Sequence, residues 1–374
     1  MKILIAPDKF KGSLSAVDAV AAIARGWSAV FPEDTLEAAP IADGGEGFAE
    51  AMCVALDGEW IRCTALDPIG REITARYAWV EKGRVAVIEM SEASGLWRLQ
   101  KDELAPLRAN TFGTGQLIRD ATGRGAKTIL VGLGGSATTD GGIGMAAALG
   151  YHFFGADGSE LPPLPGNLSN LARIDSREAI KLPEIIAASD VQNPLLGPRG
   201  TARVFAPQKG ADESTVEALE THLAHFAEVV VKGFGVDHRE SPGAGAAGGI
   251  GFGLLSFCGA KMQSGFEVVA QALQIEERIA KCDLVITGEG RLDTQTLEGK
   301  GPAGLAALAQ KHGKPILALA GSIAGDRAVA NVFTASLPIL DEPTTLSDAM
   351  ARGAEFLERA ATRAARLISL GKNL

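Results

Sequence analysis

The chain has 374 residues, enough for two or three domains of ordinary size and too many for a small disulfide-stabilised module. Hydrophobic residues make up 46% and charged residues 22%, a composition that excludes a disordered chain. The net charge of −9 gives no general attraction to nucleic acid or to anionic membranes, so we expect neither as a partner. Glycine, with 46 residues, exceeds its usual share of roughly 7%, and a folded chain must place that excess mainly in loops.

Cysteine usage and hydropathy indicate a cytoplasmic protein. The four cysteines are scattered among apolar neighbours and form no CxxC pair, as is typical of reduced, buried thiols. No apolar run approaches the roughly 18 residues of a membrane-spanning helix, and the apolar run at the N-terminus is shorter than the core of a signal peptide. The close pair His222 and His225 is interpreted as the solvated face of an amphipathic helix rather than as zinc ligands, because no HExxH pattern is present.

The first 57 residues predict the order strand, helix, strand, helix. A short apolar run over residues 3–6 is followed by a capping box at residues 15–18, which opens a helix. A second strand over residues 36–41 leads through the loop ADGGEG into a helix over residues 48–56. From residue 60 to residue 90 the hydrophobic period changes to two, which favours antiparallel strands and the start of a different domain.

The rest of the chain returns to alternating strands and helices. We expect strands over residues 128–133, 184–190, 283–290 and 315–321, and helices around Met145, over residues 216–231, after Pro302 and over residues 348–370. This order predicts an α/β protein with a doubly wound parallel-sheet domain built from residues 1–60 and 281–374, and a second α/β domain with a mixed sheet inserted as residues 61–280. A contiguous division into two domains is the alternative.

The clearest functional signal is the segment TILVGLGGSATTDGG, residues 128–142. A predicted strand here runs into six small residues that precede a helix: Gly134, Gly135, Ser136, Ala137, Thr138 and Thr139. Backbone N–H groups that no side chain obstructs bind phosphate oxygens at such a helix start, and the hydroxyls add further donors. The loop therefore predicts a phosphate site. The structural alternative is a tight turn that needs glycine for its backbone angles.

Two other glycine patterns compete with this interpretation. Residues 132–137 also match GxGxxA after a strand, with Asp157 near the distance of a ribose-binding acid, so a dinucleotide site stays open. A second match, GAGAAG at residues 243–248, lacks a preceding strand and is interpreted as a flexible or ligand-covering loop. Neither the Walker pattern GxxxxGK[ST] nor the motif set of protein kinases is present, and both classes are excluded.

Charged residues gather directly after four of the predicted strands. They are Asp8, Lys9 and Lys11 after the first, Asp43 and Glu46 after the second, Asp190 after EIIAAS, and Glu289, Arg291 and Asp293 after DLVIT. Phosphoryl transfer needs this mixture: carboxylates for Mg²⁺, cations against the transferring charge, and an acid that takes the proton of the acceptor hydroxyl. Asp43 and Asp190 also stand where helix caps are expected, so capping is the alternative role for each.

Taken together, five segments resemble the type 1 glycerate kinase family. They are APDKFKGSLSA (6–16), ADGGEG (42–47), GLGGSATTDGG (132–142), SDVQNPLLG (189–197) and TGEGRLDTQTLEGKGP (287–302), in this order over nearly the whole chain. The chain departs from the family pattern at Lys9, Phe48 and Thr139, where Ser, Thr and Asn are usual. The resemblance implies ATP-dependent phosphorylation of D-glycerate, usually at the 2-hydroxyl, and a two-domain fold with a Rossmann-like or flavodoxin-like part.

These observations lead to one hypothesis for the site. The loop 134–139 binds the phosphates of ATP, and one or two of Asp43, Glu46 and Asp190 hold Mg²⁺. Asp190 is the first candidate for the general base and Asp293 the second. Three further candidates, Lys11, Arg291 and Lys300, hold the glycerate carboxylate and the transferring phosphoryl group. Lys9, Ser13 and Glu289 are candidates for other contacts to glycerate.

Other functions stay open at this point. Phosphorylation at the 3-hydroxyl differs from the 2-position only by a small displacement of one hydroxyl group. A nicotinamide-dependent reductase of a small hydroxy acid would use the GLGGSA turn, and a non-catalytic receptor would close two α/β domains on a small ligand. The sequence also leaves a homodimer open.

Overall fold

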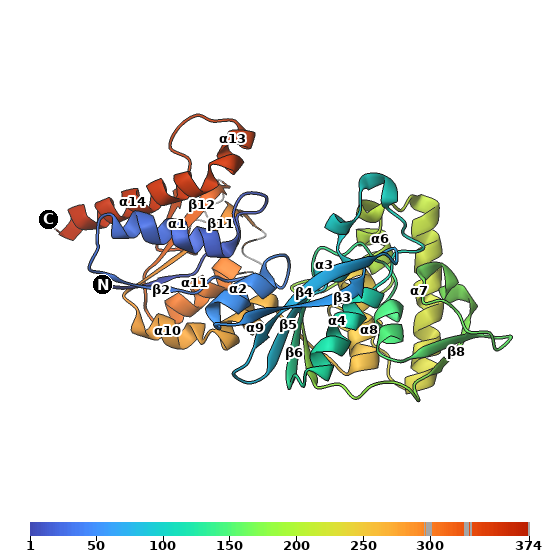
Figure 1. Cartoon of the computed structure of the whole chain (residues 1–374). Coiled ribbons are helices and arrows are strands. Elements are labelled where there is room, and N and C mark those ends of the chain that lie inside the picture. The colour runs from blue at the N-terminus through green and yellow to red at the C-terminus, as the bar shows by residue number, and fades with distance from the viewer. Residues whose placement is uncertain (295, 297–300, 325–328, 330, 373–374) are drawn as a thin grey trace. The chain divides into compact units, whose positions relative to one another are not determined.

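The computed structural model describes residues 1–294, 296, 301–324, 329 and 331–372, and the chain divides into two compact units (Figure 1). The first unit comprises Met1–Asp43, Glu50–Asp57 and Phe266–Leu374, and the second comprises Gly44–Ala49 and Gly58–Gly265. Both chain ends thus belong to one unit and the middle of the chain to the other. Relative to the expected boundaries, residues 266–280 lie with the chain ends, and residues 44–49 and 58–60 lie with the middle of the chain.

The first unit contains a parallel sheet. Its described strands, in spatial order, are β13 (Ala335–Pro338), β12 (Ile316–Ile323), β11 (Leu284–Leu292), β1 (Lys2–Ile5) and β2 (Thr35–Ala38). Every neighbouring pair is parallel. Numbered along the chain, the order is the 2-1-3-4-5 of flavodoxin-like folds, whose ligands bind at the carboxyl ends of the strands where the order reverses. The flavodoxin-like prediction is confirmed, and the reversal lies between β1 and β11.

Several helices accompany this sheet. They are α1 (Ala16–Ser28), α2 (Phe48–Ala55), α9 (Gly265–Ala272), α10 (Ile275–Lys281), α11 (Gly301–Lys311), α13 (Leu346–Ala351) and α14 (Gly353–Lys372). Of these helices, α1, α10, α11 and α14 contact the strands of the sheet. The predicted cap of α1 is confirmed, because the Ser15 hydroxyl accepts the N–H of Asp18 at 3.1 Å. Figure 1 shows α1 beside α14, and Gly26 allows that approach, since a Cβ there would lie 2.2 Å from the Glu358 carbonyl oxygen.

The single closing helix that we expected over residues 348–370 is wrong in one respect. The segment forms two helices, α13 and α14, with a break at Arg352, and α14 begins at Gly353. A Cβ at Gly353 would lie 2.2 Å from the Ser13 hydroxyl oxygen. The chain thus changes direction where it passes close to the loop after β1, and residue periodicity alone does not report that contact.

The second unit is built on a mixed sheet, as predicted. Its described strands, in spatial order, are β10 (Lys261–Gln263), β9 (Glu184–Ala188), β6 (Thr128–Gly132), β5 (Val85–Glu89), β4 (Glu72–Val80) and β3 (Glu59–Leu66). The pairs from β10 to β5 are parallel, and the β5–β4 and β4–β3 pairs are antiparallel. A separate antiparallel hairpin joins β7 (His152–Gly155) to β8 (Leu171–Asp175).

Helices pack around this sheet and around the hairpin. They are α3 (Ser91–Ser94), α4 (Phe112–Gly123), α5 (Ile143–Ala148), α6 (Thr201–Phe205), α7 (Glu213–Phe234) and α8 (Ala246–Cys258), with short 3-10 turns η1 (Leu96–Arg98), η2 (Lys101–Glu103), η3 (Pro165–Asn170) and η4 (Pro207–Lys209). One buried cluster joins the sheet to α4 and α8, and a second joins the hairpin to α6 and α7. None of the described helices is long and apolar enough to cross a membrane.

The segment 243–248 is not the flexible or ligand-covering loop that we expected. It leads into α8 and is largely buried, with Gly248 and Gly249 in the left-handed region at φ of +81° and +86°. A Cβ at Gly248 would lie 1.8 Å from the Thr138 carbonyl oxygen. These glycines are therefore explained by close packing against the loop 134–139 rather than by mobility.

Candidate active site

The loop 134–139 presents several backbone donors at the carboxyl end of β6. It is attached to α3 and η1 by two hydrogen bonds, from the Ala137 N–H to the Ser94 carbonyl (2.9 Å) and from the Leu96 N–H to the Gly135 carbonyl (2.8 Å). Within the described part of the chain, five other N–H groups of the loop make no hydrogen bond: those of Gly134, Gly135, Ser136, Thr138 and Thr139. A row of backbone N–H groups that make no hydrogen bond is the feature expected of an anion-binding loop.

The loop packs against a second predicted motif within the same unit. A Cβ at Gly134 would lie 2.6 Å from the Cα of Gly45, and a Cβ at Gly132 would lie 2.6 Å from the Gly44 carbonyl oxygen. Gly44, at φ of +81°, in turn lies against the Ala188 carbonyl at the end of β9. The structure therefore brings together the segment that carries Glu46, the loop 134–139, and the strand end that precedes Asp190.

Asp140 anchors the far end of the loop. Its carboxylate is buried and accepts four hydrogen bonds, from the Thr111 N–H (2.8 Å), the Thr111 hydroxyl (2.7 Å), the Gly142 N–H (3.1 Å) and the Gly144 N–H (3.1 Å). Burial raises the pKa of Asp140, and these donors oppose that shift. Asp140 thus ties the loop and the start of α5 to the start of α4.

Two hydroxyl groups in the loop are buried without a hydrogen-bonding partner. The Oγ1 atoms of Thr138 and Thr139 are both in this state among the described residues, and both side chains are fully buried. Buried polar groups are nearly always hydrogen-bonded in native proteins, so each exception needs an explanation such as a missing ligand or water.

Lys209 is a residue of this region that sequence reasoning missed. It ends η4 and is 1% exposed, and its ammonium donates to the Ser136 hydroxyl oxygen (2.8 Å) and to the Thr138 carbonyl (2.5 Å). Burial lowers the pKa of Lys209 to about 7, and the charge of Asp140 opposes that shift. Nothing in APQKG marks this lysine, because its role depends on a contact 73 residues away in the chain.

The first unit gathers carboxylates where its strand order reverses. Asp8 follows β1, is 8% exposed and lies beside Gly301, whose Cβ would be 3.1 Å from the Asp8 Oδ2 atom. Burial raises the pKa of Asp8 to about 7; the charges of Asp43 and Glu289 add to this shift, and that of Lys9 opposes it. The Lys9 ammonium lies 3.3 Å from the Asp43 Oδ1 atom.

The other predicted residues of the first unit differ in how they are held. Glu289 accepts the Thr296 hydroxyl at 2.8 Å, and the exposed Arg291 pairs with Asp293 at 3.1 Å. Lys11 is exposed, whereas the Ser13 hydroxyl donates to the Met350 carbonyl at 2.6 Å. Lys300 lies outside the described residues.

The carboxylates fit Mg²⁺ in kind but provide few ligands. Carboxylate oxygens are hard donors, and Mg²⁺ in kinase sites takes only one or two of them, with water and substrate phosphates completing the shell. No group of three or more acidic, histidine or cysteine side chains suited to a metal occurs among the described residues. Asp190 Oδ1 accepts the Gly265 N–H at 3.1 Å, at the start of α9. No helix begins directly after Asp190, so the expected cap of a following helix is wrong.

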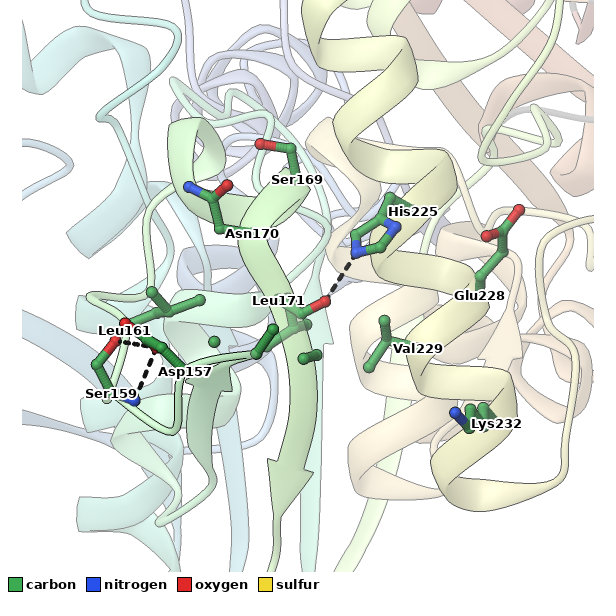
Figure 2. Close-up of a pocket in the computed structure, with 13 residues that line it drawn as sticks. Asp157, Ser159, Leu161, Ser169, Asn170, Leu171, His225, Glu228, Val229 and Lys232 are labelled. Carbon is green, nitrogen blue, oxygen red and sulfur yellow. Dashed lines mark hydrogen bonds between the residues drawn. The ribbon is translucent and has the colours of Figure 1, made fainter.

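A separate cavity of about 830 Å³ lies in the second unit between the β7–β8 hairpin and α7 (Figure 2). None of the residues named in the phosphoryl-transfer hypothesis lines it, whereas Asp157, the acid of the dinucleotide alternative, does. The expected solvated histidine face is wrong, because His225 contacts the Leu171 carbonyl at 2.7 Å and His222 contacts the Pro165 carbonyl at 3.0 Å, both partly buried. The pair fastens α7 to the hairpin and its flanking turn.

The dinucleotide alternative lacks its structural basis. After the loop and α5, the chain enters β7, which pairs antiparallel with β8 outside the main sheet. A dinucleotide fold needs a parallel strand at this point, with an acid at its end. Asp157 instead lies in a hairpin turn, where it accepts the N–H and the hydroxyl of Ser159.

A flavodoxin-like unit with charged residues at its reversal point, and a second α/β unit with a glycine-rich loop of free backbone donors, are features of α/β enzymes that bind small ligands at strand ends. Comparison with known proteins gives the family. The model of the glycerate kinase family matches residues 3–369. The chain is 42% identical to a glycerate kinase of Bacillus subtilis (strain 168), over 100% of this chain and 99% of the relative.

Two further comparisons agree. The chain is 42% identical to a glycerate 2-kinase of Escherichia coli (strain K12), over 99% of both chains. A crystal structure of a provisionally named glycerate kinase 2 from Salmonella typhimurium LT2 matches with a TM-score of 0.91 and 40% identity, over 100% of both chains. The chain belongs to the glycerate kinase family, and it is therefore a kinase with ATP as a substrate.

Proposed function

We propose that the protein transfers the γ-phosphoryl group of ATP to the 2-hydroxyl of D-glycerate and releases 2-phosphoglycerate. The observation that carries this proposal is the match to the glycerate kinase family over residues 3–369, together with the 42% identity to a relative named glycerate 2-kinase. The alternative product, 3-phosphoglycerate, requires only a different placement of one hydroxyl group.

The loop 134–139 binds the phosphates of ATP. Its N–H groups that make no hydrogen bond and the Ser136 hydroxyl support this assignment, because each is a donor that a phosphate oxygen can accept from. The second unit thus provides the nucleotide site. The dinucleotide and receptor alternatives explain neither the topology after the loop nor the family match.

The first unit binds glycerate and stabilises the transferring charge. Arg291 and Lys11 are exposed cations at the carboxyl edge of the sheet, and Lys9 lies beside Asp43. A short anionic substrate offers a carboxylate and two hydroxyls, which Arg and Lys side chains and Glu289 can bind. Ser13 and Lys300 complete the proposed set, with the Ser13 proton already donated to Met350.

Asp190 acts as the general base, with Asp293 as the second candidate. A carboxylate that accepts the hydroxyl proton makes the glycerate oxygen a better nucleophile. Asp43, Glu46 and Asp190 are the proposed ligands of Mg²⁺, of which one or two are needed. When bound, the ion would neutralise charge on the β- and γ-phosphates.

A coupled assay with D-glycerate and ATP·Mg²⁺, with the product resolved by ³¹P NMR, tests the proposal directly. We expect turnover with 2-phosphoglycerate as the product. Formation of 3-phosphoglycerate would mean that the phosphoryl group is transferred to the 3-hydroxyl. Absence of phosphorylation, together with oxidation of added NADH, would favour the reductase instead. Light scattering in the same buffer distinguishes a monomer from the proposed homodimer.

We also propose that the enzyme is cytoplasmic, because its substrate ATP is made and kept in the cytoplasm.

A further inference from the structure

We propose that Lys209 is a positioning residue for the phosphoryl donor: its ammonium group fixes the donors of the loop 134–139 so that they face the phosphates of ATP. This inference rests on the proposed function of the loop. Lys209 is 1% exposed, so its ammonium group is not accessible for binding phosphate itself. It acts through the two loop atoms that it holds, the Ser136 hydroxyl oxygen and the Thr138 carbonyl oxygen.

The contact with Thr138 sets the direction of a backbone donor. A trans peptide is planar, so the carbonyl of Thr138 and the N–H of Thr139 point in opposite directions. Lys209 holds that carbonyl at 2.5 Å, and Gly248 packs against the same oxygen from α8. The Thr139 N–H is therefore aimed away from Lys209, and within the described residues it makes no hydrogen bond.

The contact with Ser136 sets the direction of a hydroxyl proton. A protonated lysine donates and cannot accept, so the Ser136 oxygen must be the acceptor in their 2.8 Å hydrogen bond. The hydroxyl proton is then directed elsewhere and is available to an anion. A neutral lysine could accept that proton instead, and the loop would lose a donor.

The cost of burying this charge argues for a functional role. Removing a lysine from water is expensive, and an apolar side chain would fill the same space without that cost. Asp140 is the titratable group whose charge acts on Lys209 among the described residues, and it is already engaged by four hydrogen bonds. An anion bound on the loop would supply the second negative charge and favour the protonated lysine.

The test compares Lys209→Met with Lys232→Met, which removes an exposed charge from α7 in the same unit. We expect Lys209→Met to raise the KM for ATP by about tenfold or more, and to change the KM for glycerate by less than about threefold. Lys232→Met should match the wild type in both. Calorimetry in buffers of different ionisation enthalpy should show proton uptake on ATP binding at pH 7.5 that Lys209→Met lacks.

The outcomes separate this inference from the proposed function. A wild-type enzyme that does not phosphorylate glycerate would refute the proposed function. An active wild type with an unchanged KM for ATP in Lys209→Met would refute only the role of Lys209. Should Lys209→Met not fold, the calorimetry of the wild type decides: proton uptake on ATP binding at pH 7.5 supports the inference, and its absence overturns it.

Discussion

The two groups of site residues are built in opposite ways. In the second unit, the loop 134–139 consists of small, mostly buried residues whose backbone is fixed by close packing against residues 44–46 and α8. In the first unit, the predicted residues are long charged side chains at the ends of strands, and Arg291 and Lys11 are exposed. A site that binds through the backbone needs glycines at fixed spacings, which can be recognised in a sequence. A site that binds through side chains shows only suitable residue types, so the role of each residue cannot be assigned from the sequence.

The largest expected effect comes from breaking the backbone site. Gly135 has φ of +65°, and its Cβ would contact Ser91 at 3.4 Å, so Gly135→Val forces a strained loop. We expect calorimetry to show no ATP binding while circular dichroism shows a folded protein. Gly158→Val is the matched control, because Gly158 also has positive φ (+81°) but has open space around it in an exposed turn. If Gly135→Val retained its affinity for ATP, the nucleotide would have to bind at another place in the protein.

A smaller loss is expected at the proposed base. Asp190→Asn keeps the shape of the side chain and removes its ability to take a proton, so kcat should fall by roughly 10² or more. Asp157→Asn, in an exposed turn of the same unit, serves as the control and should leave kcat unchanged. Turnover close to that of the wild type would exclude Asp190 as the base and favour Asp293.

The smallest effect concerns stability and tests the cost of burying the Lys209 charge beside the loop 134–139. Burial lowers the pKa of Lys209 from 10.5 to about 7, so the unfolded chain binds more protons than the folded one between these values. The wild type therefore gains stability as pH rises through this window, and it loses that gain as pH falls towards 7. Lys209→Met lacks this dependence.

Urea unfolding measures the consequence. The free energy of unfolding of Lys209→Met, relative to the wild type, should be higher at pH 6 than at pH 9, by about 1 kcal/mol or more. An equal difference at both pH values would mean that Lys209 titrates normally in the folded protein.

Much of the fold could be predicted from the sequence. The strands around residues 3–6, 128–133 and 184–190 are short apolar runs next to glycine or proline, and their alternation with helices implied parallel pairing. The same reasoning failed for residues 243–248, because their glycines serve close packing against Thr138 rather than a mobile loop. Clustered glycines indicate that the backbone approaches other atoms closely. Only the fold shows whether those atoms belong to a ligand or to another segment of the chain.

The candidate site could be predicted in part. Glycine and strand context located the loop 134–139 and its neighbour at residues 44–46, which the structure brings together. Lys209 and Asp140 escaped prediction because their importance lies in burial and in contacts distant along the chain. Asp8 was visible as a charged residue after a strand, but its raised pKa depends on burial beside Asp43 and Glu289.

The central claim is that the two units divide the substrates, with ATP on the backbone loop and glycerate on the charged side chains. Steady-state kinetics of Ser136→Ala and Arg291→Ala, with both KM values measured for each variant, test it most directly. We predict that Ser136→Ala raises the KM for ATP several-fold and leaves that for glycerate unchanged, and that Arg291→Ala does the reverse. Variants that both raise the KM for ATP, or both raise only that for glycerate, would contradict the division.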